Sequence, residues 1–109
     1  MNTTGENVKQ RFGDLINGEI PVLVDMFATW CGPCKMLEPA VKQVAHKMTG
    51  KIKVLKIDID KNPHVAKAYQ VMGVPTLILF HKGQILWRTS GVLPAHEIEK
   101  SVEKALTVK

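Results

Sequence analysis

The chain has 109 residues, of which 45% are hydrophobic, and a formal net charge of +5 at pH 7. This length and composition suit one soluble globular domain, so we expect a single domain over residues 1–109 with a core that needs no disulfide staples. The chain has no apolar run near the ~20 residues that cross a bilayer, no secretory leader and no run of basic residues. We therefore expect a cytoplasmic monomer that binds neither membranes nor nucleic acids.

The chain opens with signals for a helix followed by a strand. Thr3 and Glu6 form a capping-box pattern, and apolar residues follow at helical spacing, which predicts a helix over residues 4–17. The nearly continuous apolar run at residues 22–28 then predicts a strand that is buried on both faces.

A second helix and a second strand follow. The helix should run from the region of Cys31 to Met48, with a kink at Pro39, because proline lacks the backbone N–H and clashes with the preceding turn. Residues 52–59 predict a second strand, which a right-handed crossover would place parallel to the first.

The second half of the chain predicts a short helix, a hairpin and a last helix. Asn62-Pro63 resembles a cap followed by proline at the first helical position, and this helix should extend to about residue 70. Strands at residues 76–81 and 84–89 are joined by a tight Lys-Gly turn, and Pro94 opens the last helix. The expected fold is α/β, with a mixed sheet and helices on both faces.

Cys31 and Cys34 are the only cysteines, and they lie between the first predicted strand and the second helix. A C-x-x-C at such a junction predicts a redox dithiol, since the two Cα atoms fall within the range that a disulfide needs. As a staple, so short a loop would stabilise the fold by only about 2 kcal/mol. A reversible catalytic pair is therefore the better interpretation.

The two cysteines should have different roles. Cys31 would lie at the helix N-terminus, where free N–H groups and the helix dipole favour a thiolate, so we expect it to be the nucleophile. Cys34 lies one turn further along and would be the resolving thiol.

Metal and haem binding are poorly supported by the surrounding residues. There is no second C-x-x-C, and haem attachment would require histidine where Lys35 follows the motif. A zinc finger would need two histidines three to five residues apart, but the four histidines are at least fifteen residues apart: His46, His64, His81 and His96.

The segment Trp30-Cys31-Gly32-Pro33-Cys34-Lys35-Met36 resembles the active-site motif of the thioredoxin family, and the resemblance extends from about Phe12 to Leu106. It implies the thioredoxin fold and reduction of disulfide-containing protein substrates. It also implies recycling by a thioredoxin reductase, which alone would use NADPH and FAD, with no cofactor bound to this chain.

The chain departs from the family pattern at two places. Phe27 stands where the family usually has tryptophan, which should alter the packing beside the dithiol. The N-terminal segment is also too short for the usual first strand. We therefore expect a four-stranded sheet in which residues 52–59 form an edge.

Two charged residues are candidates for supporting the dithiol. Asp25 interrupts a buried strand, where burial would raise its pKa, and the resemblance implies that it accepts the proton of Cys34 through a water. A carboxylate held by structural hydrogen bonds is the alternative. Lys56 alternates with apolar neighbours, which predicts a solvent-facing side chain, whereas the resemblance places it near Asp25.

The resemblance also implies a substrate surface around Cys31. Pro75 would be a cis proline facing the dithiol, although most X-Pro bonds are trans, and the backbone of Val74 would pair with an extended substrate segment. The expected apolar docking residues are Trp30, Gly32, Pro33, Val74, Pro75, Gly91 and Val92.

Two other functions remain compatible with the dithiol. The same fold could serve as a disulfide oxidase or isomerase, although the Gly-Pro pair between the cysteines resembles the reducing members. Alternatively, the chain could be a binding subunit in which the dithiol is incidental.

Overall fold

The structure is a computed structural model that describes residues 12–107. Residues 12–16 are helical, while the predicted cap at Thr3 and Glu6 and the first part of that helix lie outside the described residues. The other predicted elements are all present, with bounds within about two residues of those expected: β1 (Val22–Phe27), α2 (Gly32–Lys47), β2 (Lys53–Asp58), α3 (Pro63–Ala68), β3 (Thr76–His81), β4 (Gln84–Ser90) and α4 (Ala95–Thr107).

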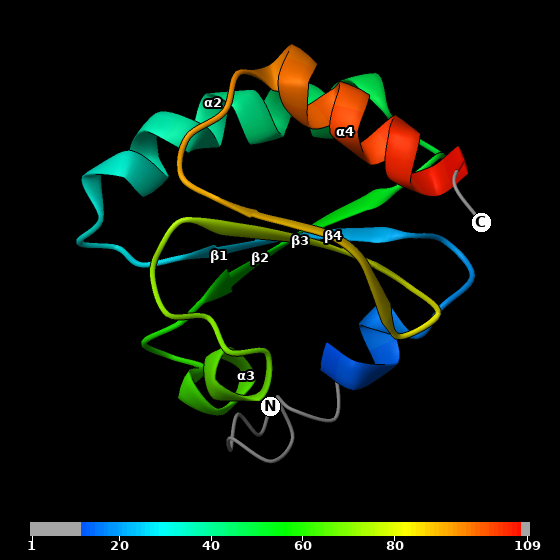
Figure 1. Cartoon of the computed structure of the whole chain (residues 1–109). Helices are drawn as coiled ribbons and strands as arrows, with labels where there is room; N and C mark the ends of the chain where they lie inside the picture. Colours follow the sequence, from blue (N-terminus) through cyan, green and yellow to red (C-terminus); the bar gives the residue numbers. More distant parts are fainter. Residues whose placement is uncertain (1–11, 108–109) are drawn as a thin grey trace.

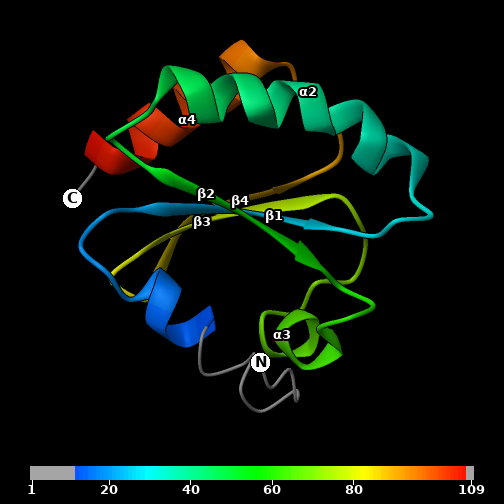
Figure 2. The same cartoon turned by 180° about the vertical axis from the view of Figure 1, so that it is seen from behind.

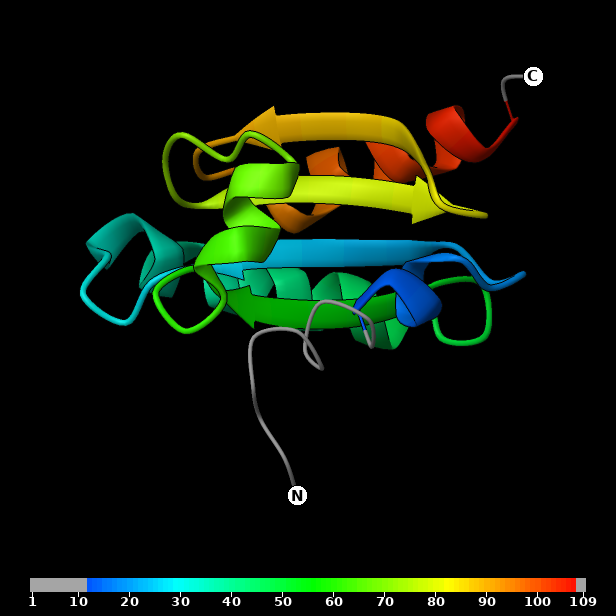
Figure 3. The ribbon, with the colours of Figure 1, turned by 90° about the horizontal axis from the view of Figure 1, so that it is seen from below.

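The four strands form one mixed sheet in the order β2-β1-β3-β4. β1 pairs with β2 in parallel, and the β1–β3 and β3–β4 pairs are antiparallel. Figure 3 shows the four strands side by side, with β2 at one edge. The prediction of a mixed four-stranded sheet with the second strand at its edge is confirmed for the described residues.

Helices cover both faces of the sheet. α2 and α4 lie together on one face, and α3 and the helical residues 12–16 lie on the other (Figures 1 and 2). Successive side chains of β1 point to opposite faces, so Leu23 packs beneath α2 and α4 while Val22 and Val24 face the other layer. This double burial explains why the sequence of β1 is almost wholly apolar.

The topology gathers four connections at one end of the sheet. The parallel strands β1 and β2 both end there. Because β3 runs antiparallel to β1, and β4 antiparallel to β3, β3 begins at this end and β4 ends there. The dithiol follows β1, and the Val74–Pro75 bond immediately precedes β3. Segments that are distant in sequence therefore meet around the cysteines.

Candidate active site

Cys31 and Cys34 are joined by a disulfide, with Cα atoms 5.3 Å apart. Cys31 is the N-cap of α2: its backbone is extended, and its Sγ accepts a hydrogen bond from the backbone N–H of Cys34 at 3.1 Å. In the reduced protein the same N–H, together with the positive end of the helix dipole, favours a thiolate at Cys31. Exposure does not distinguish the two residues, which are 4% and 5% exposed.

The segment before β3 contacts the dithiol from the opposite side. The Val74–Pro75 peptide bond is cis, as predicted, and the carbonyl oxygen of Val74 lies 3.7 Å from Sγ of Cys31. The carbonyl of Pro75 accepts a hydrogen bond from the N–H of Gly91 at 3.0 Å, and Gly91 has a φ of +94°, which favours glycine. These contacts bring together three of the predicted docking residues next to Cys31.

The predicted docking residues differ in exposure. Trp30 is 69% exposed, and its Nε1 donates to Oδ2 of Asp60 at 2.7 Å, which fixes the indole beside the dithiol. Val92 is 43% exposed, and Gly32 and Pro33 are also exposed.

Pro75 and Val74 differ in exposure within this predicted surface. Pro75 is buried, it leads directly into β3, and its carbonyl oxygen accepts the hydrogen bond from Gly91. It therefore supports the surface from below, while Val74, which is half-buried, provides the backbone that faces Cys31.

Asp25 is buried beneath α2. It is 2% exposed, and its Oδ1 has no hydrogen-bond partner within residues 12–107. Burial raises the pKa of Asp25 from 3.8 to about 6; the charge of Lys56 opposes this rise and that of Glu38 adds to it. The carboxyl group can therefore gain or lose a proton close to neutral pH.

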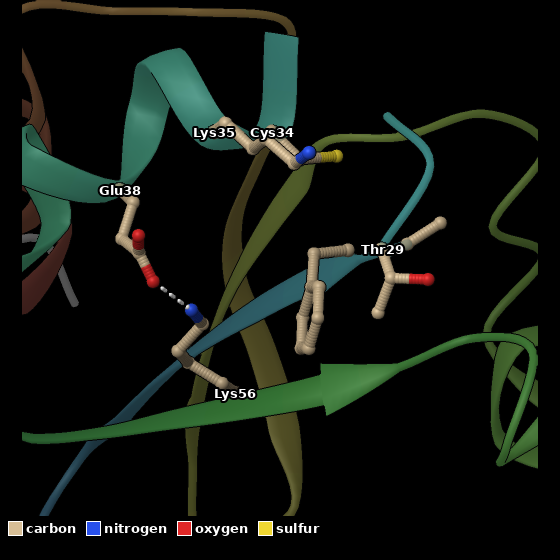
Figure 4. Close-up of a pocket in the computed structure, with 7 residues that line it drawn as sticks. Thr29, Cys34, Lys35, Glu38 and Lys56 are labelled. Carbon is tan, nitrogen blue, oxygen red and sulfur yellow. Dashed lines mark hydrogen bonds and ion pairs between the residues drawn. The ribbon is translucent and has the colours of Figure 1, made fainter. Parts of the chain in front are cut away.

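Lys56 agrees in part with both expectations, a solvent-facing side chain and a position near Asp25. Its side chain is 40% exposed, yet its strand position is the register partner of Asp25. The ammonium donates a hydrogen bond to Oε2 of Glu38 at 2.6 Å and lies 4.7 Å from the centre of the Phe27 ring. Figure 4 shows the Lys56–Glu38 pair reaching between β2 and α2.

A pocket of about 210 Å³ lies between α2 and the end of β1, with Cys34 in its wall. Glu38 and Lys56 form another part of this wall (Figure 4). Phe27, which stands where the thioredoxin family usually has tryptophan, also lines the pocket. The residues that line the pocket are Phe27, Ala28, Thr29, Cys34, Lys35, Glu38 and Lys56.

Comparison with known proteins agrees with this geometry. Residues 3–104 match the model of the thioredoxin family. The chain belongs to the thioredoxin family. It is 45% identical over 98 residues to Thioredoxin 1 of Chlorobaculum tepidum, a match that covers 89% of this chain and 97% of that one.

Two further relatives extend the comparison. The crystal structure of chloroplastic thioredoxin z superposes with a TM-score of 0.80 at 36% identity and covers 92% of this chain and 90% of that one. The bifunctional thioredoxin reductase/thioredoxin of Mycobacterium leprae is 45% identical over 80 residues, which are 73% of this chain and 18% of that protein.

Membership of the thioredoxin family defines the general activity. The chain is a thiol-disulfide oxidoreductase that reduces protein disulfides through the Cys31–Cys34 pair. Thioredoxins need no bound cofactor for this reaction, because the reduced cysteine pair itself supplies the two electrons and becomes the disulfide. Within residues 12–107, no helix is long and apolar enough to cross a membrane, and no cluster of three or more acidic, histidine or cysteine side chains could hold a metal.

Sequence reasoning did not identify Glu38 or Asp60 as part of the site. Glu38 lies four residues after Cys34, so both side chains project from the same side of α2, and this spacing was an available signal. Asp60 follows β2 and gave no comparable signal, because its bond to Trp30 depends on how two loops meet at the end of the sheet.

Proposed function

We propose that Cys31 is the attacking nucleophile, Cys34 the resolving thiol and Asp25 the proton acceptor in the reduction of protein disulfides. The observation that best supports this assignment is the N-cap position of Cys31. The hydrogen bond from the Cys34 N–H to Sγ of Cys31 stabilises negative charge on that sulfur, and no comparable donor serves Cys34 in the described residues.

The first step forms a mixed disulfide. The Cys31 thiolate attacks one sulfur of the substrate disulfide, a new bond forms between Cys31 and that sulfur, and the other substrate sulfur leaves as a thiolate. The exposed Trp30 and Val92 would contact the substrate chain on either side of Cys31, and the backbone of Val74 would pair with it.

The second step releases the reduced substrate. Cys34 transfers its proton to Asp25 through a water, and its sulfur attacks Sγ of Cys31, which breaks the mixed disulfide and expels the second substrate thiolate. The substrate has then gained two electrons, and the chain has become the Cys31–Cys34 disulfide. A pKa of about 6 suits Asp25 to this role, since the carboxylate is available at neutral pH.

A separate reductase would restore the dithiol. We assign this role to a thioredoxin reductase that passes two electrons from NADPH through FAD to the Cys31–Cys34 disulfide. The Mycobacterium leprae relative, which is named as both enzymes in one chain, supports such a pairing.

The remaining expectations concern the setting in which the protein works. A dithiol that must return to its reduced form suits the cytoplasm, where thiols are kept reduced. We also propose that the protein works as a monomer. Cell fractionation and sedimentation test these two proposals.

An NADPH-coupled assay with a model disulfide substrate tests the assignment of the cysteines. Cys31→Ser should abolish reduction, whereas Cys34→Ser should form a mixed disulfide with the substrate that persists on a non-reducing gel. Activity of Cys31→Ser equal to that of wild type, or trapping by Cys31→Ser instead of Cys34→Ser, would contradict the proposal.

The direction of the reaction is tested by the equilibrium of the disulfide with glutathione. A reductase should hold its disulfide at a potential of about −270 mV, whereas the potential of a disulfide-forming oxidase is about −120 mV. A potential at the oxidising end would support the oxidase alternative and exclude general reduction.

A further inference from the structure

The pocket beside the dithiol contains a charged pair whose position suggests a second role for α2. Cys34 and Glu38 are four residues apart on this helix, so they face the same side, and both line the pocket. Lys56 completes the pair from β2, across the opening between helix and sheet (Figure 4). The ion pair thus shares the wall of the pocket with Cys34.

The charge of Lys56 acts on two carboxyl groups, those of Glu38 and Asp25. Its strand position is paired in register with Asp25, so the two side chains emerge from neighbouring points on the same face of the sheet. The ammonium nevertheless bonds to Glu38 at 2.6 Å, while Oδ1 of Asp25 is left without a partner in the described part of the chain. The contact of the ammonium with the Phe27 ring at 4.7 Å also holds it at this position.

We propose that Glu38 is a positioning residue of this site, which holds the Lys56 ammonium in the wall of the pocket and so controls proton transfer between Cys34 and Asp25. Glu38 does not touch the reacting sulfur atoms in this role. It acts by competing with Asp25 for the same cation.

Both electrostatic effects of Glu38 on Asp25 have the same sign. The negative charge of Glu38 raises the pKa of Asp25 directly, and its bond to Lys56 keeps a positive charge from moving closer to the buried carboxyl. The pKa of Glu38 itself is lowered, chiefly by its hydrogen bond to Lys56, so Glu38 is charged at the pH at which Asp25 titrates.

The neighbours of the pocket and of Asp25 come from α2, β2 and β3. From α2 the pocket receives Lys35 and Cys34 besides Glu38, and β2 contributes Lys56. On β3 the register partner of Asp25 is the apolar Leu77. Lys42, one turn beyond Glu38, lowers the pKa of Glu38 and is the next charge along the helix.

The titration of the Asp25 carboxyl group, followed by carbon NMR in wild type and Glu38→Gln, tests this proposal. Loss of the Glu38 charge should lower the titration midpoint of Asp25 by about half a pH unit or more. Glu38→Asp, which keeps the charge, should remain closer to wild type. In a Lys56→Met background, the effect of Glu38→Gln should be smaller, because the competition for the cation is gone.

Glu99→Gln is the matched control. Like Glu38, Glu99 forms an ion pair with a lysine, in this case Lys47 at 3.5 Å, but it does not line the dithiol pocket. It should leave the Asp25 titration unchanged. An unchanged or raised midpoint in Glu38→Gln, or an equal fall in Glu99→Gln, overturns the proposal.

The link to catalysis rests on the proposed role of Asp25 and has a separate readout. The acid limb of the pH profile for resolving the mixed disulfide should move to lower pH in Glu38→Gln, together with the NMR midpoint. If the NMR midpoint moves and the rate profile does not, Asp25 is not the proton acceptor, and the control of Cys34 by Glu38 is overturned with it.

Discussion

Replacing Asp25 by asparagine should make the oxidised protein more stable at neutral and alkaline pH. The side chain is 2% exposed and its Oδ1 lacks a partner in residues 12–107, so burial penalises its charged form and raises its pKa from 3.8 to about 6. Asparagine has nearly the same shape and stays neutral at every pH, so it avoids this penalty.

The size of the effect follows from the two pKa values. Well below pH 3.8 the carboxyl group is protonated in both the folded and the unfolded chain, and it contributes no difference there. Between 3.8 and about 6 the unfolded chain has released its proton while the folded chain retains it, so the stability of wild type falls as the pH rises. Above the folded pKa the penalty no longer changes with pH. It is about 3 kcal/mol, because each unit of difference between the folded and unfolded pKa values corresponds to about 1.4 kcal/mol.

Guanidinium unfolding of the disulfide form, followed by far-UV circular dichroism from about pH 3 to 8, measures this difference. The advantage of Asp25→Asn over wild type should grow by about 3 kcal/mol across the range. Asp14→Asn removes an exposed carboxylate and serves as the control, with no such growth expected. An advantage of Asp25→Asn that is the same at both ends of the range, or one that shrinks as the pH rises, would refute the argument.

Three further predictions concern the frame of the site, and denaturant unfolding measures each. Gly91→Ala should lower the free energy of unfolding by about 1–2 kcal/mol because of the φ of +94°, whereas Gly32→Ala, with open space around it, should change it little; equal losses would contradict this. Trp30→Phe and Asp60→Ala each remove the same Nε1–Oδ2 hydrogen bond and should each cost about 0.5–1.5 kcal/mol, with the double variant costing no more than either; additive losses would contradict a shared bond. Ile98→Ala should cost about 2–5 kcal/mol, because this fully buried side chain joins α4 to the core; a cost below 1 kcal/mol would be inconsistent with that packing.

The sequence predicted most of the fold because its signals are local. Apolar runs, Pro63 and Pro94 at helix starts, and the Lys82-Gly83 turn each involve neighbouring residues, and the structure places elements at all of them. The edge position of β2 followed from the family resemblance, not from the pattern of its own residues.

The site was predicted less completely because its contacts depend on packing. Cys31 and Asp25 were identified from their places in the chain, but the bond between Lys56 and Glu38 depends on how far α2 lies from the edge strand. Likewise, the hydrogen bond from Gly91 to the carbonyl of Pro75 depends on how the start of β3 meets the end of β4. The spacing of residues along the chain predicts neither of these two contacts.

The burial of Asp25 links the stability of this protein to its chemistry. A carboxyl group in water has a pKa near 4 and is a poor match for a thiol that must lose its proton near neutral pH. Bringing the pKa to about 6 requires an environment that disfavours the charged form, and the resulting penalty of about 3 kcal/mol is a large part of the roughly 5–15 kcal/mol that stabilises a typical domain. A variant that relieves the penalty should therefore also weaken Asp25 as a proton acceptor, so gains in stability at this position should coincide with slower release of the reduced substrate.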